Sequence, residues 1–339
     1  MGVVSLLDKR ILKVAVVGSG KMGLLHASII NIMQNSNLVA ICDKSVLVRK
    51  FLKKGLKGIR IVDDVKKFSD FDLDAVYVTT PIPSHFSVVK AIYSGKICQN
   101  IFVEKTLSAC YAEAKELYDL SKSFPGINMV GYVRRFSVTF RKAKDLLDKG
   151  AIGKPTSFEA YAFSSDLLGI DETSKAPLNR GGVLKDLGSH AVDVALWFFG
   201  DLNVSTDETP LSDGVVLSDF LRFGVENQNG LEGKFEISWR VKNYRTPEIG
   251  FSIIGTKGKL RVNDDKIELK LKGKSSLTMH RHDLHDNAQF WLGGPEYFRE
   301  DEHFVKSVLQ NVGTESDFLN ALKVDEILDI LSQRDDENV

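Results

Sequence analysis

Near its N-terminus the chain reads Val14-Ala15-Val16-Val17-Gly18-Ser19-Gly20-Lys21-Met22-Gly23. An apolar, β-branched run ends at the first glycine, and apolar residues spaced by three and four then indicate a helix. A strand, a glycine turn and a helix in this order give the G-x-G-x-x-G pattern its meaning. Gly18 permits a tight turn, Gly20 lets a pyrophosphate approach the backbone, and Gly23 lets the helix pack closely on the strand. The stretch therefore predicts a dinucleotide site at the N-terminus of a helix.

A second signal lies at the distance that this motif requires. Residues 38–42 are predicted to form the next strand, and Asp43 follows it. An acidic residue about 20 positions after the glycines accepts hydrogen bonds from the adenosine ribose. A carboxylate there favours NAD over NADP, because it binds the 2′-hydroxyl and repels a 2′-phosphate. Lys44 and Arg49 follow closely, so NADP is kept as the alternative.

The composition is that of a globular protein without a charge bias. The length of 339 residues suggests about two domains. The 45 Lys and Arg balance 45 Asp and Glu, which argues against a nucleic acid partner, since a polyanion needs a basic surface. No apolar run approaches the ~20 residues of a membrane span, so we expect no membrane partner. Three cysteines in no metal-binding spacing indicate reduced thiols in a cytoplasmic protein.

Strand and helix patterns alternate through the first third of the chain. This alternation predicts a parallel, doubly wound sheet, the Rossmann arrangement. Ligands bind such sheets at the carboxyl ends of the strands, so we expect the glycine turn, Asp43, residues 79–81 and residues 104–105 to meet in one crevice. Further strands are predicted at 59–62, 75–79, 101–103 and 128–133, and helices before Gly95 and at 111–121.

The pattern changes in the second part of the chain. Apolar and polar residues alternate at 234–241 and 266–272, which indicates an antiparallel sheet with one buried face. We therefore predict an α/β protein with a Rossmann domain at 1–132 and an α+β domain at 133–339, whose largely antiparallel, open-faced sheet serves substrate binding and oligomerisation. Helices are predicted at 138–149, 185–199, 300–310 and 317–331, an extended run at 157–164, and a loop over a site at 165–180.

Two stretches carry ionisable side chains at positions that suit catalysis, a strand end and one face of a helix. Glu104-Lys105 follows a predicted buried strand, where a lysine can transfer a proton or polarise a substrate carbonyl. Asp186, His190 and Asp193 have the spacing of one helix face, where a carboxylate orients an imidazole as a general base. The plainer interpretation of Glu104-Lys105 is an exposed ion pair, and that of Asp186 and His190 is a structural Asp–His pair.

Together these motifs resemble the Gfo/Idh/MocA family of NAD(P)-dependent oxidoreductases, which act mainly on sugars, inositols and related compounds. The glycine motif with its trailing His26, residues 79–85, residues 104–105 and residues 181–193 match the family's motifs. The resemblance covers nearly the whole chain. The predicted site residues are Lys105, Asp186 and His190 for catalysis; Gly18, Gly20, Lys21, Met22, Asp43, Thr79, Thr80, Pro81, His85, Glu104 and Lys105 for the cofactor; and Tyr132, Arg134, Asn179 and Arg180 for the substrate.

The resemblance implies hydride transfer between a nicotinamide and a secondary alcohol or carbonyl. His190, oriented by Asp186, would take the hydroxyl proton, while Lys105 stabilises the charge on the same oxygen; which of the two takes the proton stays open. Thr106 stands where the family usually has proline, and Val133 where many members have asparagine.

Rival interpretations remain for the function and for one cluster of histidines. The chain could be a non-catalytic dinucleotide sensor, or a redox-neutral enzyme that cleaves or epimerises a sugar with bound NAD. His280, His282 and His285 lie close together, but no closed ligand set is evident, so we predict no metal. This segment could instead border the substrate pocket or a subunit contact. A homodimer or homotetramer is expected through the open sheet face.

Overall fold

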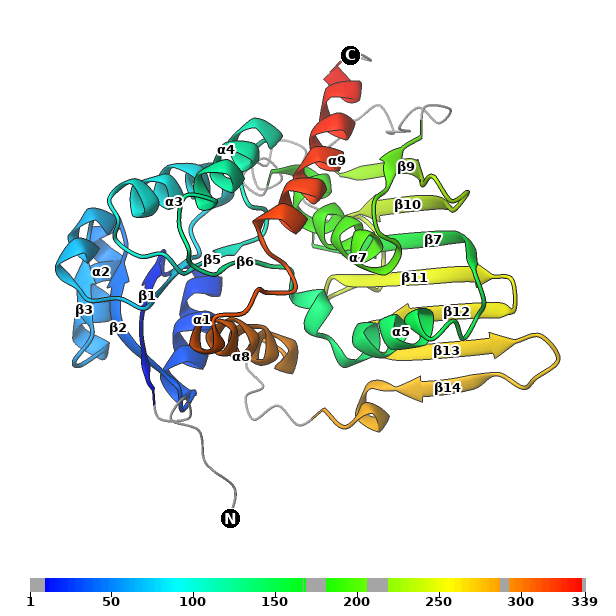
Figure 1. Cartoon of the computed structure of the whole chain (residues 1–339), viewed down its shortest axis with the longest axis horizontal. Coiled ribbons are helices and arrows are strands. Elements are labelled where there is room, and N and C mark those ends of the chain that lie inside the picture. Colours follow the sequence, from blue (N-terminus) through cyan, green and yellow to red (C-terminus); the bar gives the residue numbers. More distant parts are fainter. Residues whose placement is uncertain (1–9, 167, 169–180, 206–218, 287–292, 337–339) are drawn as a thin grey trace. The chain divides into compact units, whose positions relative to one another are not determined.

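The computed structural model describes residues 10–166, 168, 181–205, 219–286 and 293–336 (Figure 1). By its internal contacts the chain divides into one compact unit of residues 1–133 and 288–322 and a second of residues 134–287 and 323–339. The first boundary lies one residue from the predicted one, but residues 288–322 join the first unit and not the second domain as expected. No helix among the described residues is long and apolar enough to cross a membrane.

The first unit contains a six-stranded sheet in which every strand pair is parallel. Its strands are β1 (Leu12–Val17), β2 (Ser36–Cys42), β3 (Arg60–Val62), β4 (Ala75–Val78), β5 (Ile101–Glu104) and β6 (Asn128–Gly131). The order β3-β2-β1-β4-β5-β6 confirms the predicted doubly wound sheet. The order reverses between β1 and β4, so the ligand crevice is expected at their carboxyl ends.

Helices cover both faces of this sheet (Figure 1). They are α1 (Lys21–Ile32), α2 (Val46–Gly55), α3 (His85–Ser94), α4 (Tyr111–Ser121) and α8 (Pro295–Gln310). Helix α8 packs beside α1, and α3 packs beside α4. The Phe304 ring of α8 lies 5.4 Å from the Tyr77 ring and 5.8 Å from the Phe102 ring. Residues 288–322 were predicted to belong to the second domain because a helical pattern shows which face is apolar, but not which sheet that face covers.

The second unit contains an eight-stranded sheet of order β14-β13-β12-β11-β7-β10-β9-β8. Its strands are β7 (Pro155–Phe163), β8 (Asn203–Val204), β9 (Phe220–Glu226), β10 (Glu232–Ser238), β11 (Glu248–Gly255), β12 (Gly258–Asn263), β13 (Lys266–Leu271) and β14 (Leu277–His280). Among the described strands of this sheet, only β7 and β10 pair in parallel, so the prediction of a largely antiparallel sheet is confirmed.

One face of this sheet carries the core of the second unit. Helix α5 (Val138–Asp148) contacts β12 and β13, and α7 (Ser189–Phe199) contacts β7 and β11. The Phe158 ring stacks on Phe199 at 4.7 Å and meets Phe251 at 5.9 Å. Residues that alternate with this core point to the opposite face, where Glu159 and Lys234 are exposed and Tyr161 and Phe163 are half-buried. Helix α9 (Phe318–Asp336) contains the division between the units, at residues 322 and 323.

Candidate functional site

The three glycines of the turn have three different surroundings. Gly18 has a φ of +91°, and a Cβ there would lie 2.9 Å from Thr80 Cγ2. At Gly23 a Cβ would lie 1.9 Å from the carbonyl oxygen of Gly18, so the helix could not approach the strand this closely. At Gly20 a Cβ would meet no atom of the described residues within 4 Å. The turn is therefore closed at its two ends and open in the middle, where a pyrophosphate would approach.

The N-terminus of α1 opens onto the same turn. Gly20 is the N-cap, and no side chain in the described part of the chain caps this helix. The free amides of the first turn and the helix dipole favour an anion there. Lys21 is exposed and Met22 is half-buried at the first helical positions.

Asp43 follows β2 and is held by backbone and hydroxyl donors. Its Oδ2 accepts from the Ser19 amide at 2.9 Å, and its Oδ1 accepts from the Ser45 amide at 2.8 Å. Partial burial acts to raise the pKa of Asp43, but these hydrogen bonds hold it below the ordinary value. The guanidinium of Arg49 donates to the carbonyls of Asp43 and Lys44 at 2.8 and 2.7 Å, so the backbone already engages it. This arrangement suits a ribose diol better than a 2′-phosphate.

A cavity of about 450 Å³ joins these features within the first unit. Gly18, Asp43, Thr80 and Pro81, all predicted to bind the cofactor, line it. The cavity has further lining residues that are not among the predicted cofactor residues. These are Val17, Cys42, Lys44, Asp63, Asp64, Val65, Lys66, Ser84, Ser87, Val88 and Ala91. Asp63 and Asp64 directly follow β3, so the rule that ligands bind at carboxyl strand ends could have found them.

Two predicted cofactor residues support the cavity wall from behind. The Thr79 hydroxyl donates to the Gly18 carbonyl at 2.8 Å. His85 is fully buried, and its Nδ1 and Nε2 each lie 2.7 Å from a backbone carbonyl, those of Thr106 and Thr80. Burial lowers the pKa of His85, although both carbonyls act to raise it. The ring therefore joins the end of β4 to the segment after β5.

Glu104 lies at the end of β5 in a buried polar chain that we call the His26 network (Asp301, His26 and Glu104). His26 Nε2 is 2.9 Å from Glu104 Oε1, and His26 Nδ1 is 2.8 Å from Asp301 Oδ1. Burial acts to lower the pKa of His26, but the two carboxylates outweigh it and raise this pKa well above the ordinary value. The Lys105 amide donates to Glu104 Oε2 at 3.1 Å. The sequence analysis could not predict a role for Asp301, because this residue lies far along the chain from every motif.

The His26 network also overlaps a group of possible metal ligands. Within the described ranges, His26, Glu300 and Asp301 form the one group of three such side chains whose ligand atoms lie within 4.8 Å of one another. Both His26 nitrogens face carboxylate oxygens, so hydrogen bonds account for the ring without a metal. The His280–His285 segment forms the end of β14 and a 3-10 turn, and the His280 and His282 rings stack at 5.6 Å.

In the second unit the catalytic candidates lie on an interrupted helix. Residues Leu184–Gly188 form a π-helical turn, so the predicted regular helix from 185 is wrong at its start. Asp186 lies in this turn and His190 follows on α7, and both are half-buried. Asp193 is fully buried and its Oδ1 is 2.6 Å from Arg135 Nη2, which removes it from the acid–base candidates. A π-helical turn has more residues than an α-helical turn, so it changes the helix face on which each later residue lies. Sequence spacing does not reveal such a turn.

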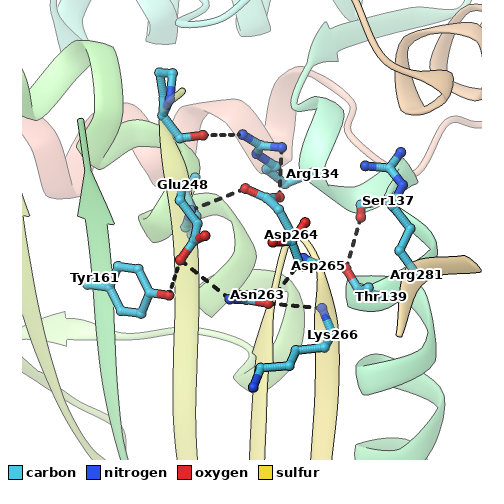
Figure 2. Close-up of polar contacts among 12 residues, drawn as sticks. Arg134, Ser137, Thr139, Tyr161, Glu248, Asn263, Asp264, Asp265, Lys266 and Arg281 are labelled. Atoms are coloured by element: carbon cyan, nitrogen blue, oxygen red, sulfur yellow. Dashed lines mark hydrogen bonds and ion pairs between the residues drawn. The ribbon is translucent and has the colours of Figure 1, made fainter. Parts of the chain in front are cut away.

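The substrate candidates have mixed outcomes. Tyr132 is fully buried. Figure 2 shows Arg134 directed at Asp264. Its Nη1 lies 2.7 Å from Asp264 Oδ1, and its Nη2 donates to the Pro247 carbonyl at 3.2 Å. This favours the pairing of Arg134 with an acidic neighbour over a substrate role. Asn179 and Arg180, and most of the predicted loop at 165–180, lie outside the described residues.

Comparisons with known proteins add to this geometry. The model of an oxidoreductase family with an NAD-binding Rossmann fold matches residues 12–132, and that of the GFO/IDH/MocA C-terminal domain matches residues 140–261. An uncharacterised oxidoreductase of Schizosaccharomyces pombe is 33% identical over 133 residues, which are 39% of this chain and 35% of that protein. The scyllo-inositol 2-dehydrogenase (NAD(+)) of Bacillus subtilis is 27% identical over 73% of this chain and 72% of its own.

A solved structure extends the likeness to the whole fold. Levoglucosan dehydrogenase in complex with NADH superposes with a TM-score of 0.81. The two chains are 20% identical, and the match covers 97% of this chain and 98% of that one. At this identity the likeness concerns the fold. The two family matches together span most of the chain and include the glycine turn, Asp43 and the Glu104-Lys105 pair. The chain belongs to the Gfo/Idh/MocA family of oxidoreductases, and its first unit contains the family's NAD-binding Rossmann domain.

Proposed function

We propose that this protein is an NAD-dependent dehydrogenase that oxidises a secondary alcohol of a cyclic polyol or sugar. The observation that carries the proposal is the cavity of the first unit, which has an open glycine turn at one side and the Asp43 carboxylate at another. The turn fits a pyrophosphate because Gly20 leaves free space beside uncapped helix amides. When bound, the nicotinamide supplies the hydride acceptor. The scyllo-inositol 2-dehydrogenase of Bacillus subtilis is named for a cyclic polyol, which supports rings with several secondary hydroxyls as the substrate class.

The proposed catalytic residues are Lys105 of the first unit and Asp186 and His190 of the second. Lys105 follows the carboxyl end of β5, where its amide is held by Glu104. Its ammonium would stabilise the negative charge that develops on the substrate oxygen. His190 would take the hydroxyl proton, with Asp186 as the carboxylate that orients its ring. Lys105 as the proton acceptor is the alternative within this proposal.

The test is a screen of inositols, cyclic sugars and sugar acids for absorbance at the NADH wavelength with NAD and with NADP. We expect turnover with NAD, and a loss of about 100-fold or more in kcat for Lys105→Ala and for His190→Ala. NADH binding, followed by fluorescence, should survive in both variants. Lys90→Ala is the matched control, because Lys90 lies on the exposed face of α3 and pairs with Glu116 at 2.6 Å.

The rival functions predict different outcomes of the same screen. NADH binding without turnover on any substrate would favour a dinucleotide sensor. Conversion of a sugar without accumulation of NADH would favour a redox-neutral enzyme. Near-normal kcat in both the Lys105→Ala and His190→Ala variants would contradict the assigned residues.

We also propose a cytoplasmic homodimer or homotetramer that forms through the open face of the second unit's sheet. Cys42, Cys98 and Cys110 are free thiols, which supports a reducing compartment. On the open face Ile254 is 47% exposed among polar side chains. Sedimentation velocity of the wild type and of Ile254→Glu tests this proposal, and a monomeric wild type would contradict it.

A further inference from the structure

The His26 network connects a late segment of the chain to the residue before Lys105. Asp301 comes from α8, His26 from α1 and Glu104 from β5, and all three lie within the first unit. The exposed fraction is 0% for the His26 and Asp301 side chains and 12% for that of Glu104. Water therefore reaches only the Glu104 end, and the protein itself determines the geometry of the other two groups.

The partners of His26 determine the charge state of its ring. Both ring nitrogens lie within 3 Å of carboxylate oxygens, which only accept hydrogen bonds when ionised. A neutral ring would direct a lone pair at one of these carboxylates if both are ionised, so the geometry favours a ring with a proton on each nitrogen. Burial acts against this arrangement, because it raises the pKa of Asp301 itself. The groups that face His26 are Asp301, Glu300 and Tyr297 of α8, Glu104 of β5 and Tyr77 of β4. Burial and the acidic neighbours raise the pKa of Tyr77, so it stays neutral.

The far end of the network reaches the backbone of Lys105. Glu104 accepts from His26 with one oxygen and from the Lys105 amide with the other. On the other side of Lys105, the Thr106 carbonyl is held by His85 at 2.7 Å. The lysine is thus flanked on both sides by residues that a buried histidine holds.

We propose that Asp301 is a positioning residue, which acts through His26 and the adjoining carboxylate on the backbone of Lys105. The inference rests on the proposed function only for the catalytic role of Lys105. The carboxylate of Asp301 keeps the buried ring cationic, and the cationic ring makes a charge-assisted hydrogen bond to Glu104, which is stronger than a neutral one. Without this charge, burial would favour a neutral ring and the turn at Lys105 would be held less firmly.

The experiment uses Asp301→Asn, which keeps the shape of the side chain but removes its charge. Imidazole nitrogen NMR should find both His26 nitrogens protonated in the wild type from pH 6 to 8, and a titrating ring in the variant. The backbone amide resonance of Lys105 should follow that titration in the variant and stay constant in the wild type. With the substrate found in the screen, kcat should fall about tenfold at pH 8 and less at pH 6, with little change in KM. This is a fraction of the ~100-fold that a 1 Å misplacement can cost.

The control is Glu302→Gln, which removes a carboxylate from the next position of α8. Glu302 pairs with Lys306 on the exposed face at 2.9 Å, so this variant should keep the wild-type NMR signals and pH profile. A neutral His26 in the wild type would overturn the proposal. So would a Lys105 amide that ignores the titration of His26, or a kcat loss that is equal at all pH values. The NMR result decides the proposal even if no polyol is oxidised, an outcome that would contradict only the proposed function.

Discussion

The surroundings of His26 and His85 form a natural comparison within the first unit. Both side chains are fully buried, and both use both ring nitrogens. His26 faces the carboxylates of Asp301 and Glu104, whereas His85 faces the backbone carbonyls of Thr106 and Thr80. The pKa of His26 is raised well above the ordinary value, and that of His85 is lowered.

The opposite pKa shifts of the two rings indicate that hydrogen bonds alone do not keep a buried imidazole charged. Both rings have short contacts to acceptors, and burial opposes the charged form in both. Neutral carbonyls do not offset the loss of water, whereas full negative charges do. We therefore expect His26 to act as a fixed cation and His85 as a neutral link between two strand ends.

The largest effect is expected when His26 is removed. His26→Leu leaves Asp301 and Glu104 as buried carboxylates without a cation, and breaking a buried ion pair costs about 3–5 kcal/mol. Urea unfolding should show this loss in the free energy of unfolding. The double variant His26→Leu/Asp301→Leu should recover part of it, because it also removes one orphaned charge. A loss below about 1 kcal/mol for the single variant would contradict a charged network.

A smaller loss is expected at His85. His85→Leu removes hydrogen bonds to two backbone carbonyls but leaves no buried charge. An unsatisfied buried acceptor costs about 1–3 kcal/mol, and the loss should stay near this range because the contact with the Thr80 carbonyl is only part-buried. The same urea experiment checks it. If His85→Leu destabilises the protein more than His26→Leu does, the comparison between the two histidines fails.

The two histidines should also change stability with pH in opposite directions. Since the folded pKa of His26 is raised, its contribution is fully present below about pH 6.5, the unfolded value, and is lost as pH rises through the folded pKa. For His85 the folded pKa is lowered, so its contribution is present above about pH 6.5 and is lost as pH falls through the folded pKa. Each tenfold change in proton affinity corresponds to about 1.4 kcal/mol. Unfolding free energies of the wild type and both leucine variants between pH 5 and 9 measure the two slopes, and slopes of the same sign would refute the assignment.

The smallest effect is expected one residue away from the network. Glu302→Gln removes a carboxylate from the exposed face of α8, and a surface pair is worth at most about 1 kcal/mol. The free energy of unfolding should change by about 0.5 kcal/mol or less. A larger loss would mean that any carboxylate of α8 matters and would weaken the special role of Asp301.

The sequence predicted those features that depend on neighbours along the chain. The glycine turn, the acid after β2 and both sheet types follow from local patterns, and the structure has each of them. The relation between Asp301 and His26 could not be predicted, because 275 positions separate them and neither spacing nor composition connects them. The π-helical turn at Leu184–Gly188 and the pairing of Arg134 with Asp264 also depend on packing that no motif encodes. The proposed roles of Lys105, Asp186 and His190 stay predictions.

The discontinuity of the first unit has a consequence for synthesis on the ribosome. All six strands of its sheet have been made by Gly131, yet α8 begins only at Pro295. Until then His26 lacks the carboxylate of Asp301, and the rings of Tyr77 and Phe102 lack the cover of Phe304. The nucleotide-binding half of the nascent chain is therefore begun first and completed last, and chaperones that shield apolar surface would be needed longest there.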